Sequence, residues 1–357
     1  MHATTTTATT IVDTDIHNEV LRQEDLLPYL PEAWHRQWMT AGTGIGMPYY
    51  SPVGVLRRDA DPGNGGVPGS DPGVIVRDHL DRYGFRYGIL NWGRALEMPI
   101  HPDPDYGNAV VSAHNEYMAD AWLPADPRFR GSIVVNHADP QAAANEIDRM
   151  AGRPGFVQAI MCSAARLPFG QRCYHPIYEA AERNGLPVAI HPGTEGRGVS
   201  GAPTPSGYPT RYMEWHNILP ANYMTHVNSL VCEGVFEKFP GLKFVCIEGG
   251  VSWLPALMWR MDKNYKGLRS SAPWLKKPPS EYIKERVYFT TQPIEEPGMP
   301  EHLHSILDMA GIEDRVMYSS DYPHWDFDPP NVVASAIPRA IRSKVMGGNA
   351  MELYRLE

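Results

Sequence analysis

The chain has 357 residues, of which 43% are hydrophobic, and its formal net charge is −9. The acidic balance, with no block of lysine and arginine, excludes a nucleic-acid binder and a protein that docks on anionic membranes. The four cysteines show no CxxC spacing, which excludes a disulfide scaffold and predicts a reduced, cytoplasmic location.

The chain begins with MHATTTTATT, which has neither a cationic start nor an apolar run. We expect residues 1–10 to be a disordered tail rather than a signal peptide. No stretch of the sequence is apolar over a membrane-spanning length, so no membrane association is expected. Residues 11–357 are predicted to form a single domain.

From residue 11 onward, short apolar segments alternate with helical patterns. The predicted strands are 11–15, 86–91, 131–135, 156–161, 186–191, 242–247, 286–291 and 315–319. The predicted helices are 74–84, 108–123, 140–151, 175–184, 222–238, 253–266, 300–310 and 330–343. Eight alternating units predict an α/β fold of parallel strands closed into a (β/α)8 TIM barrel. A doubly wound open sheet is the alternative, but the first strand lacks the glycine-rich phosphate loop of that fold.

Two long loops are expected to shape a pocket, because 32 glycines and 34 prolines concentrate partly in them. The first covers 41–73 after strand one, and the second covers 192–221 after strand five. Aromatic and basic side chains in the second loop suit a flat, anionic ligand. They are Arg197, Arg211, Tyr212, Trp215 and His216. The alternative is that these side chains pack the loop or a subunit interface.

Polar side chains stand at the carboxyl ends of predicted strands, where barrel active sites are built. Asp15 and His17 are two apart on an extended segment and therefore share a face. His191, Glu248 and Asp321 each end an apolar strand. One such residue alone is usually a helix cap or a hydrogen-bonded core residue. Together, imidazole and carboxylate groups at one barrel mouth predict a site for a divalent ion such as Zn²⁺.

Four motifs resemble the amidohydrolase-2 family, whose best-known branch is the aminocarboxymuconate-semialdehyde decarboxylase group. They are Asp15-Ile16-His17, the PVAIHPG stretch at 187–193, the GVFEKFP stretch at 234–240 and the SSDYPH stretch at 319–324. Residues 348–354 are similar to the last helix of that family. The resemblance extends from about residue 11 to the end of the chain and implies the barrel fold.

The resemblance implies a divalent metal held by Asp15, His17, His191 and Asp321, with Zn²⁺ expected and Mn²⁺ or Fe²⁺ as alternatives. The sequence departs from the family pattern at two positions. Asp15 stands where His or Glu is usual, so it could bind weakly or through water. Glu248 stands where the decarboxylases commonly have a catalytic His, and a carboxylate there would be a base, a proton donor or an extra ligand.

Two further histidines are catalytic candidates. His226 begins a helical run and could approach the pocket as an acid or base, the alternative being a capping or packing role. His324 follows Asp321 in a loop, where it could contact substrate or hold the carboxylate of Asp321.

The resemblance implies an enzyme that acts on a small molecule, and we expect a non-oxidative decarboxylase of a small aromatic or unsaturated carboxylic acid. The alternative is a hydrolase that uses metal-bound hydroxide on a C–N, C–O or C–C bond, with Glu248 or Asp321 taking the proton. A barrel that binds a ligand without catalysis is a third interpretation. Because family members often dimerise, we expect a homodimer or a higher homo-oligomer, with the bulky stretch 251–261 as a candidate interface.

Overall fold

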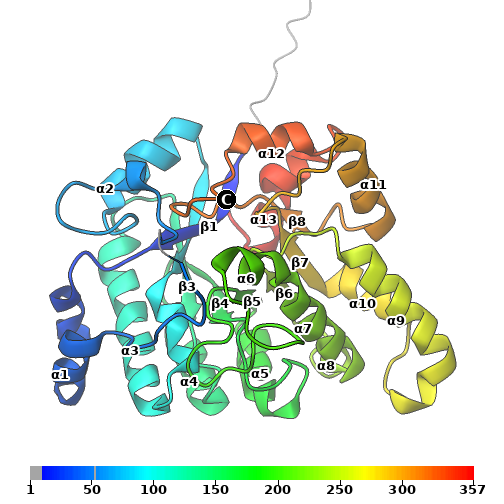
Figure 1. The fold of residues 1–357 in the computed structure, drawn as a ribbon, viewed down its shortest axis with the longest axis horizontal. Helices are drawn as coiled ribbons and strands as arrows, with labels where there is room; N and C mark the ends of the chain where they lie inside the picture. Colours follow the sequence, from blue (N-terminus) through cyan, green and yellow to red (C-terminus); the bar gives the residue numbers. More distant parts are fainter. Residues whose placement is uncertain (1–9, 52–53) are drawn as a thin grey trace, which may run out of the picture.

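The computed structural model describes residues 10–51 and 54–357, so most of the predicted tail over 1–10 lies outside the described residues. Eight parallel strands follow one another in the order β1 to β8 (Figure 1). They are β1 (Val12–Asn18), β2 (Tyr87–Trp92), β3 (Phe129–Val134), β4 (Phe156–Cys162), β5 (Val188–His191), β6 (Phe244–Cys246), β7 (Val287–Thr290) and β8 (Val316–Met317). Each predicted strand overlaps one of these.

The segment after β8 continues along β1 and closes the sheet. Thr14 N donates a hydrogen bond to Tyr318 O at 3.2 Å, and His17 N donates to Tyr322 O at 2.7 Å. Because the last strand returns to the first, the architecture is a (β/α)8 barrel, and the doubly wound alternative is excluded.

Helices surround the strands on the outside of the barrel (Figure 1). They are α1 (Glu32–Ala41), α2 (Pro72–Ile75), α3 (Pro104–Tyr117), α4 (Pro140–Met150), α5 (His175–Arg183), α6 (Tyr212–Ile218), α7 (Pro220–Cys232), α8 (Val235–Lys238), α9 (Leu254–Leu268), α10 (Pro279–Arg286), α11 (Pro300–Ala310), α12 (Pro330–Ala336) and α13 (Asn349–Leu353). Within the described residues, no helix combines the length and the apolar character needed to cross a membrane.

Several helix boundaries differ from the sequence-based expectation. The predicted loop 192–221 contains α6 and the first two residues of α7, so only its first part is irregular. The predicted helix 222–238 is interrupted at Gly234, whose φ of 72° ends α7 before α8 begins. The predicted helix 330–343 stops at Ala336, because Ile337 precedes a proline and is extended.

A buried polar network holds the first and last strands together below the barrel mouth. Asp13 Oδ2 accepts hydrogen bonds from His79 Nε2 at 2.6 Å and from Ser320 Oγ at 2.5 Å, while Asp13 Oδ1 accepts one from Ser320 N at 3.0 Å. All three residues are completely buried. These three hydrogen bonds fix the position of β1 relative to the chain that leads into Asp321.

Candidate metal centre

Five side chains from four strand ends converge at the barrel mouth. Asp15 and His17 lie on β1, His191 ends β5, and Glu248 and Asp321 follow β6 and β8. All five are buried, and each offers a ligand atom within 4.8 Å of the others. The structure therefore brings together the four predicted metal ligands and adds Glu248 to them.

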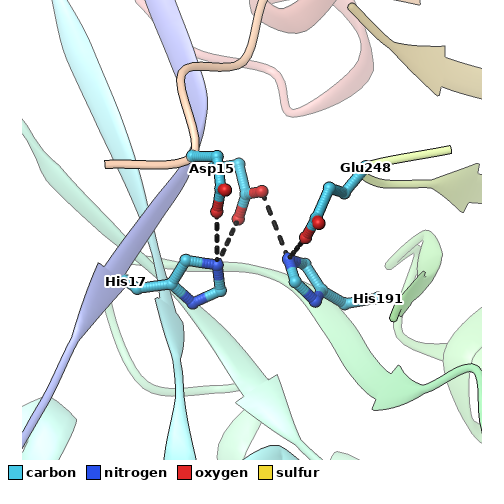
Figure 2. Close-up of side chains that lie close together, drawn as sticks. Asp15, His17, His191 and Glu248 are labelled. Carbon is cyan, nitrogen blue, oxygen red and sulfur yellow. Dashed lines mark hydrogen bonds and ion pairs between the residues drawn. The ribbon is translucent and has the colours of Figure 1, made fainter. Parts of the chain in front are cut away.

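Asp15 lies between the two imidazole rings (Figure 2). Its Oδ1 is 3.7 Å from His17 Nε2, and its Oδ2 is 3.3 Å from His191 Nε2. His17 Nε2 is also 3.1 Å from Asp321 Oδ1, and His191 Nε2 is 3.0 Å from Glu248 Oε2. Each imidazole thus directs one nitrogen at two carboxylates.

The backbone is strained where the two later carboxylates are presented. Glu248 has φ 58° and Asp321 has φ 59°, values that side chains other than glycine rarely adopt. Local hydrogen bonds hold both: Glu248 N donates to Thr290 Oγ1 at 2.9 Å, and Asp321 N donates to Asp15 O at 3.1 Å. Strain of this kind, about 1–3 kcal/mol per residue, persists where function requires an unusual side-chain position.

The donor atoms fit a divalent transition-metal ion. His17 Nδ1 faces Asn91 O at 3.2 Å and His191 Nδ1 faces Pro192 O at 2.7 Å, so each Nδ1 carries the proton and each Nε2 presents a lone pair. Within residues 10–51 and 54–357, His17 Nε2 makes no hydrogen bond although it is buried. Two imidazole nitrogens with surrounding carboxylates form the N/O ligand set of Zn²⁺, Mn²⁺ or Fe²⁺.

Two carboxyl groups of the cluster have pKa values shifted in opposite directions. Burial, together with the charges of Glu248 and Asp326, raises the pKa of Asp321 well above its usual range. Burial acts in the same direction on Glu248, but the neighbouring His191 and His216 outweigh it and lower the pKa of that carboxyl. Asp321 therefore retains a proton more readily than Glu248.

A cavity of about 500 Å³ opens directly onto the cluster. His17, His191, Glu248 and Asp321 form part of its wall. The remaining wall includes Met47, Tyr49, Leu56, Arg94, Leu96, Glu97, Arg197, Tyr212, Trp215 and His324. Its size and its mixture of apolar, aromatic and charged side chains suit a small aromatic molecule.

The predicted substrate-binding residues divide into three groups. Tyr212 and Trp215 line the cavity as expected. Arg197 also lines it, but its guanidinium is bonded to Glu97 Oε1 at 2.9 Å and to Ile45 O at 2.7 Å, so it braces the first loop. Arg211 is exposed at the start of α6, and neither it nor His216 is among the lining residues.

The predicted catalytic histidines lie in different places. His324 lines the cavity, with its Nδ1 2.7 Å from Asp321 Oδ1 and its ring stacked on His17 at 4.4 Å. His226 is buried away from the cluster, where its Nε2 donates to Ser163 O at 2.8 Å and its Nδ1 accepts from Phe169 N at 3.2 Å. Because both nitrogens of His226 are engaged in these bonds, the structure favours its packing role.

Two residues beside the site, one lining the cavity and one bonded to Asp321, were not predicted from the sequence. Arg94 follows β2 and lines the cavity, and within the described residues its guanidinium forms no ion pair. Gln292 follows β7, and its Nε2 donates to Asp321 Oδ2 at 3.3 Å and to Asp326 Oδ2 at 2.9 Å. Both stand just after strand ends, so the rule that indicated Asp321 could have found them.

Comparison with known proteins finds decarboxylases among the relatives of this sequence. A gamma-resorcylate decarboxylase of Polaromonas sp. strain JS666 is 26% identical over 297 residues, covering 78% of this chain and 85% of that protein. One from Rhodococcus jostii strain RHA1 is 27% identical over 305 residues, covering 78% of this chain and 86% of that protein.

Solved structures show the same fold. The 5-carboxyvanillate decarboxylase of Sphingomonas paucimobilis superposes with a TM-score of 0.67 at 23% identity, over 98% of this chain and 100% of that one. A dihydroxybenzoic acid decarboxylase of Polaromonas sp. JS666, solved with manganese and 2-nitroresorcinol, gives 0.67 at 20% identity, over 97% of each chain. The family profile described as amidohydrolase matches residues 15–356, and with this match over nearly its whole length the chain belongs to the amidohydrolase-2 family.

Proposed function

We propose that this protein is a metal-dependent carboxy-lyase that removes CO₂ non-oxidatively from a small aromatic carboxylic acid. One observation carries the proposal: the histidine–carboxylate cluster opens onto an aromatic-walled cavity of about 500 Å³. The relatives that are 26–27% identical over 78% of the chain, both gamma-resorcylate decarboxylases, support the same reaction.

Asp15, His17, His191 and Asp321 would hold the metal. Zn²⁺ is the ion expected from the sequence, and Mn²⁺ is an equal candidate because a structural relative contains manganese. When bound, the ion supplies positive charge that orients a carboxylate and the oxygen beside it. Glu248 contributes a second negative charge next to His191, and it differs from a histidine at this position in being unable to act as a cationic acid.

The chain's own groups would then move the proton. Asp321, hydrogen-bonded to His324, donates a proton to the ring carbon that bears the carboxylate. The bond between that carbon and the carboxylate breaks, its electron pair restores the aromatic ring, and CO₂ leaves. His324 has 21% of its side chain exposed and connects Asp321 with solvent, so it can return a proton for the next turnover.

Hydrolysis is the less supported alternative. The ionised Glu248 beside the cluster is the one feature that favours it, because a carboxylate base suits the activation of water. The relatives are decarboxylases rather than hydrolases.

The test is to incubate the Mn²⁺-loaded or Zn²⁺-loaded protein with a panel of ortho-hydroxybenzoates in D₂O. We expect stoichiometric CO₂ and one deuterium at the former carboxylate carbon of the product. The Asp321→Asn variant should release far less CO₂ from the same acid. If the benzoates remain unchanged and the protein hydrolyses members of a panel of esters, lactones or amides, the proposal is overturned in favour of hydrolysis.

The expected homodimer and the cytoplasmic location stay predictions. Trp259, with 57% of its surface exposed on α9, lies in the stretch 251–261 that the sequence indicated as an interface. Light scattering of the wild type and of Trp259→Glu tests this: a dimer should become a monomer, and an unchanged mass for the variant contradicts that interface.

A further inference from the structure

A second group of potential ligands adjoins the first. It consists of His216 on α6, Glu248 and Asp326, with ligand atoms within 4.8 Å of one another. His216 Nε2 lies 3.6 Å from Glu248 Oε1 and 3.3 Å from Asp326 Oδ2. An imidazole facing two carboxylates is an arrangement that binds divalent transition metals.

Glu248 belongs to both groups. Its Oε2 is 3.0 Å from His191, in the first group, while its Oε1 faces His216, in the second. One carboxylate therefore presents one oxygen to each site. Paired metal ions in enzymes, about 3.5–4 Å apart, commonly share ligands in this manner.

We propose that His216, Glu248 and Asp326 hold a second divalent cation, so that the barrel mouth takes two ions bridged by the carboxylate of Glu248. This inference rests on the metal of the proposed function occupying the first group. It also gives a reason for a carboxylate at residue 248, since its two oxygens can reach two ions at once.

The surroundings of His216 support a cation there. Within the described part of the chain, its buried Nε2 has no hydrogen-bond partner, although both carboxylates are close. An ion between the three groups would bind the nitrogen of His216 that both carboxylates face.

One amide side chain connects the two groups. Gln292 Nε2 donates to Asp321 Oδ2 at 3.3 Å and to Asp326 Oδ2 at 2.9 Å. The same residue therefore orients one carboxylate from each site. Such hydrogen bonds fix the direction of ligand oxygens before an ion binds.

The experiment counts manganese in the protein itself. Chelator-treated full-length protein is dialysed against saturating Mn²⁺, and bound metal is measured by elemental analysis. We expect two ions per chain in the wild type and one in both His216→Gln and Asp326→Asn. The control His302→Gln, an exposed histidine on α11, should keep two.

Electron paramagnetic resonance on the same samples tests the bridge. The wild type should show the spectrum of an exchange-coupled Mn²⁺ pair, and His216→Gln should show an isolated ion. One ion per chain in the wild type, or two retained in both variants, would overturn the inference. Neither readout uses a substrate, so the two proposals can fail independently. Two bound ions in a protein that decarboxylates no tested acid would contradict the proposed reaction but not the second metal site.

Discussion

His324 Nδ1 and Asp321 Oδ1 lie 2.7 Å apart at the point where the ligand cluster meets the cavity. Asp321 is completely buried, whereas His324 keeps 21% of its side chain exposed. The pair therefore connects a buried carboxyl group with the cavity and with solvent. In this arrangement the two residues can be separated experimentally, because only Asp321 belongs to the ligand cluster.

Replacing His324 by Gln should lower turnover of the aromatic acid by about 100-fold, the usual cost of removing a positioned acid or base. The metal content should stay at the wild-type level, because His324 is not one of the clustered ligands. Steady-state kinetics together with metal analysis checks both. A parallel loss of metal and activity would show instead that His324 supports the ion.

The arginines of the cavity should differ in their effects. Arg94→Gln should raise the KM for an anionic substrate by about tenfold, as expected for one lost charge-assisted hydrogen bond, with little change in stability. Arg197→Gln should lower the free energy of unfolding by about 3 kcal/mol, because it leaves the partly buried Glu97 without its partner. Urea unfolding and initial rates distinguish the two. If Arg197→Gln changes only the KM, then Arg197 binds the substrate and its assignment to a structural role is wrong.

Metal loading should stabilise the folded chain. An ion that binds only the folded state adds about 4 kcal/mol when its concentration is 1,000 times the Kd. Saturating Mn²⁺ should therefore raise the Tm of chelator-treated protein, and His17→Gln should reduce the rise because it removes a ligand of the first group. Differential scanning calorimetry measures it. An equal rise in the variant would show that His17 is not a ligand.

The strands were predictable because each is a short apolar run with a polar end, and burial on both faces of a barrel strand selects that pattern. Helices α6 and α10 were not predicted from the sequence. The YMEWHNI sequence of α6 lies in a segment whose glycines and prolines indicated a loop, and α10 begins at two prolines with few apolar residues after them. Their helical state depends on tertiary contacts rather than on periodicity.

The same distinction applies to the site. The sequence predicts that four ligands lie close together, because parallel strands of a barrel present their carboxyl ends at one mouth. These are Asp15, His17, His191 and Asp321. The ion pair between Arg197 and Glu97 could not be predicted, since Glu97 lies 100 residues earlier in the chain. The hydrogen bonds of His226 to Ser163 and Phe169 likewise depend on a packing arrangement that local sequence does not specify.

His114 should make the protein sensitive to acid. This residue of α3 is completely buried, its Nδ1 donates to Val110 O at 2.8 Å, and its ring contacts the edges of Trp38 and Trp92. Burial lowers its pKa from 6.5 to about 4. Between those two pH values the unfolded chain takes up a proton that the folded chain does not, so the free energy of unfolding falls as the pH falls.

At pH 5 the loss from His114 alone is about 2 kcal/mol relative to pH 7.5. The variant His114→Phe keeps an aromatic ring between the two tryptophans and removes the titrating group. Its free energy of unfolding in urea should therefore decline by about 2 kcal/mol less than that of the wild type over this range. Both proteins are measured with excess chelator, so the barrel mouth contributes equally to each. The same decline in both would mean that His114 is protonated in the folded chain at pH 5 and that its burial does not control acid stability.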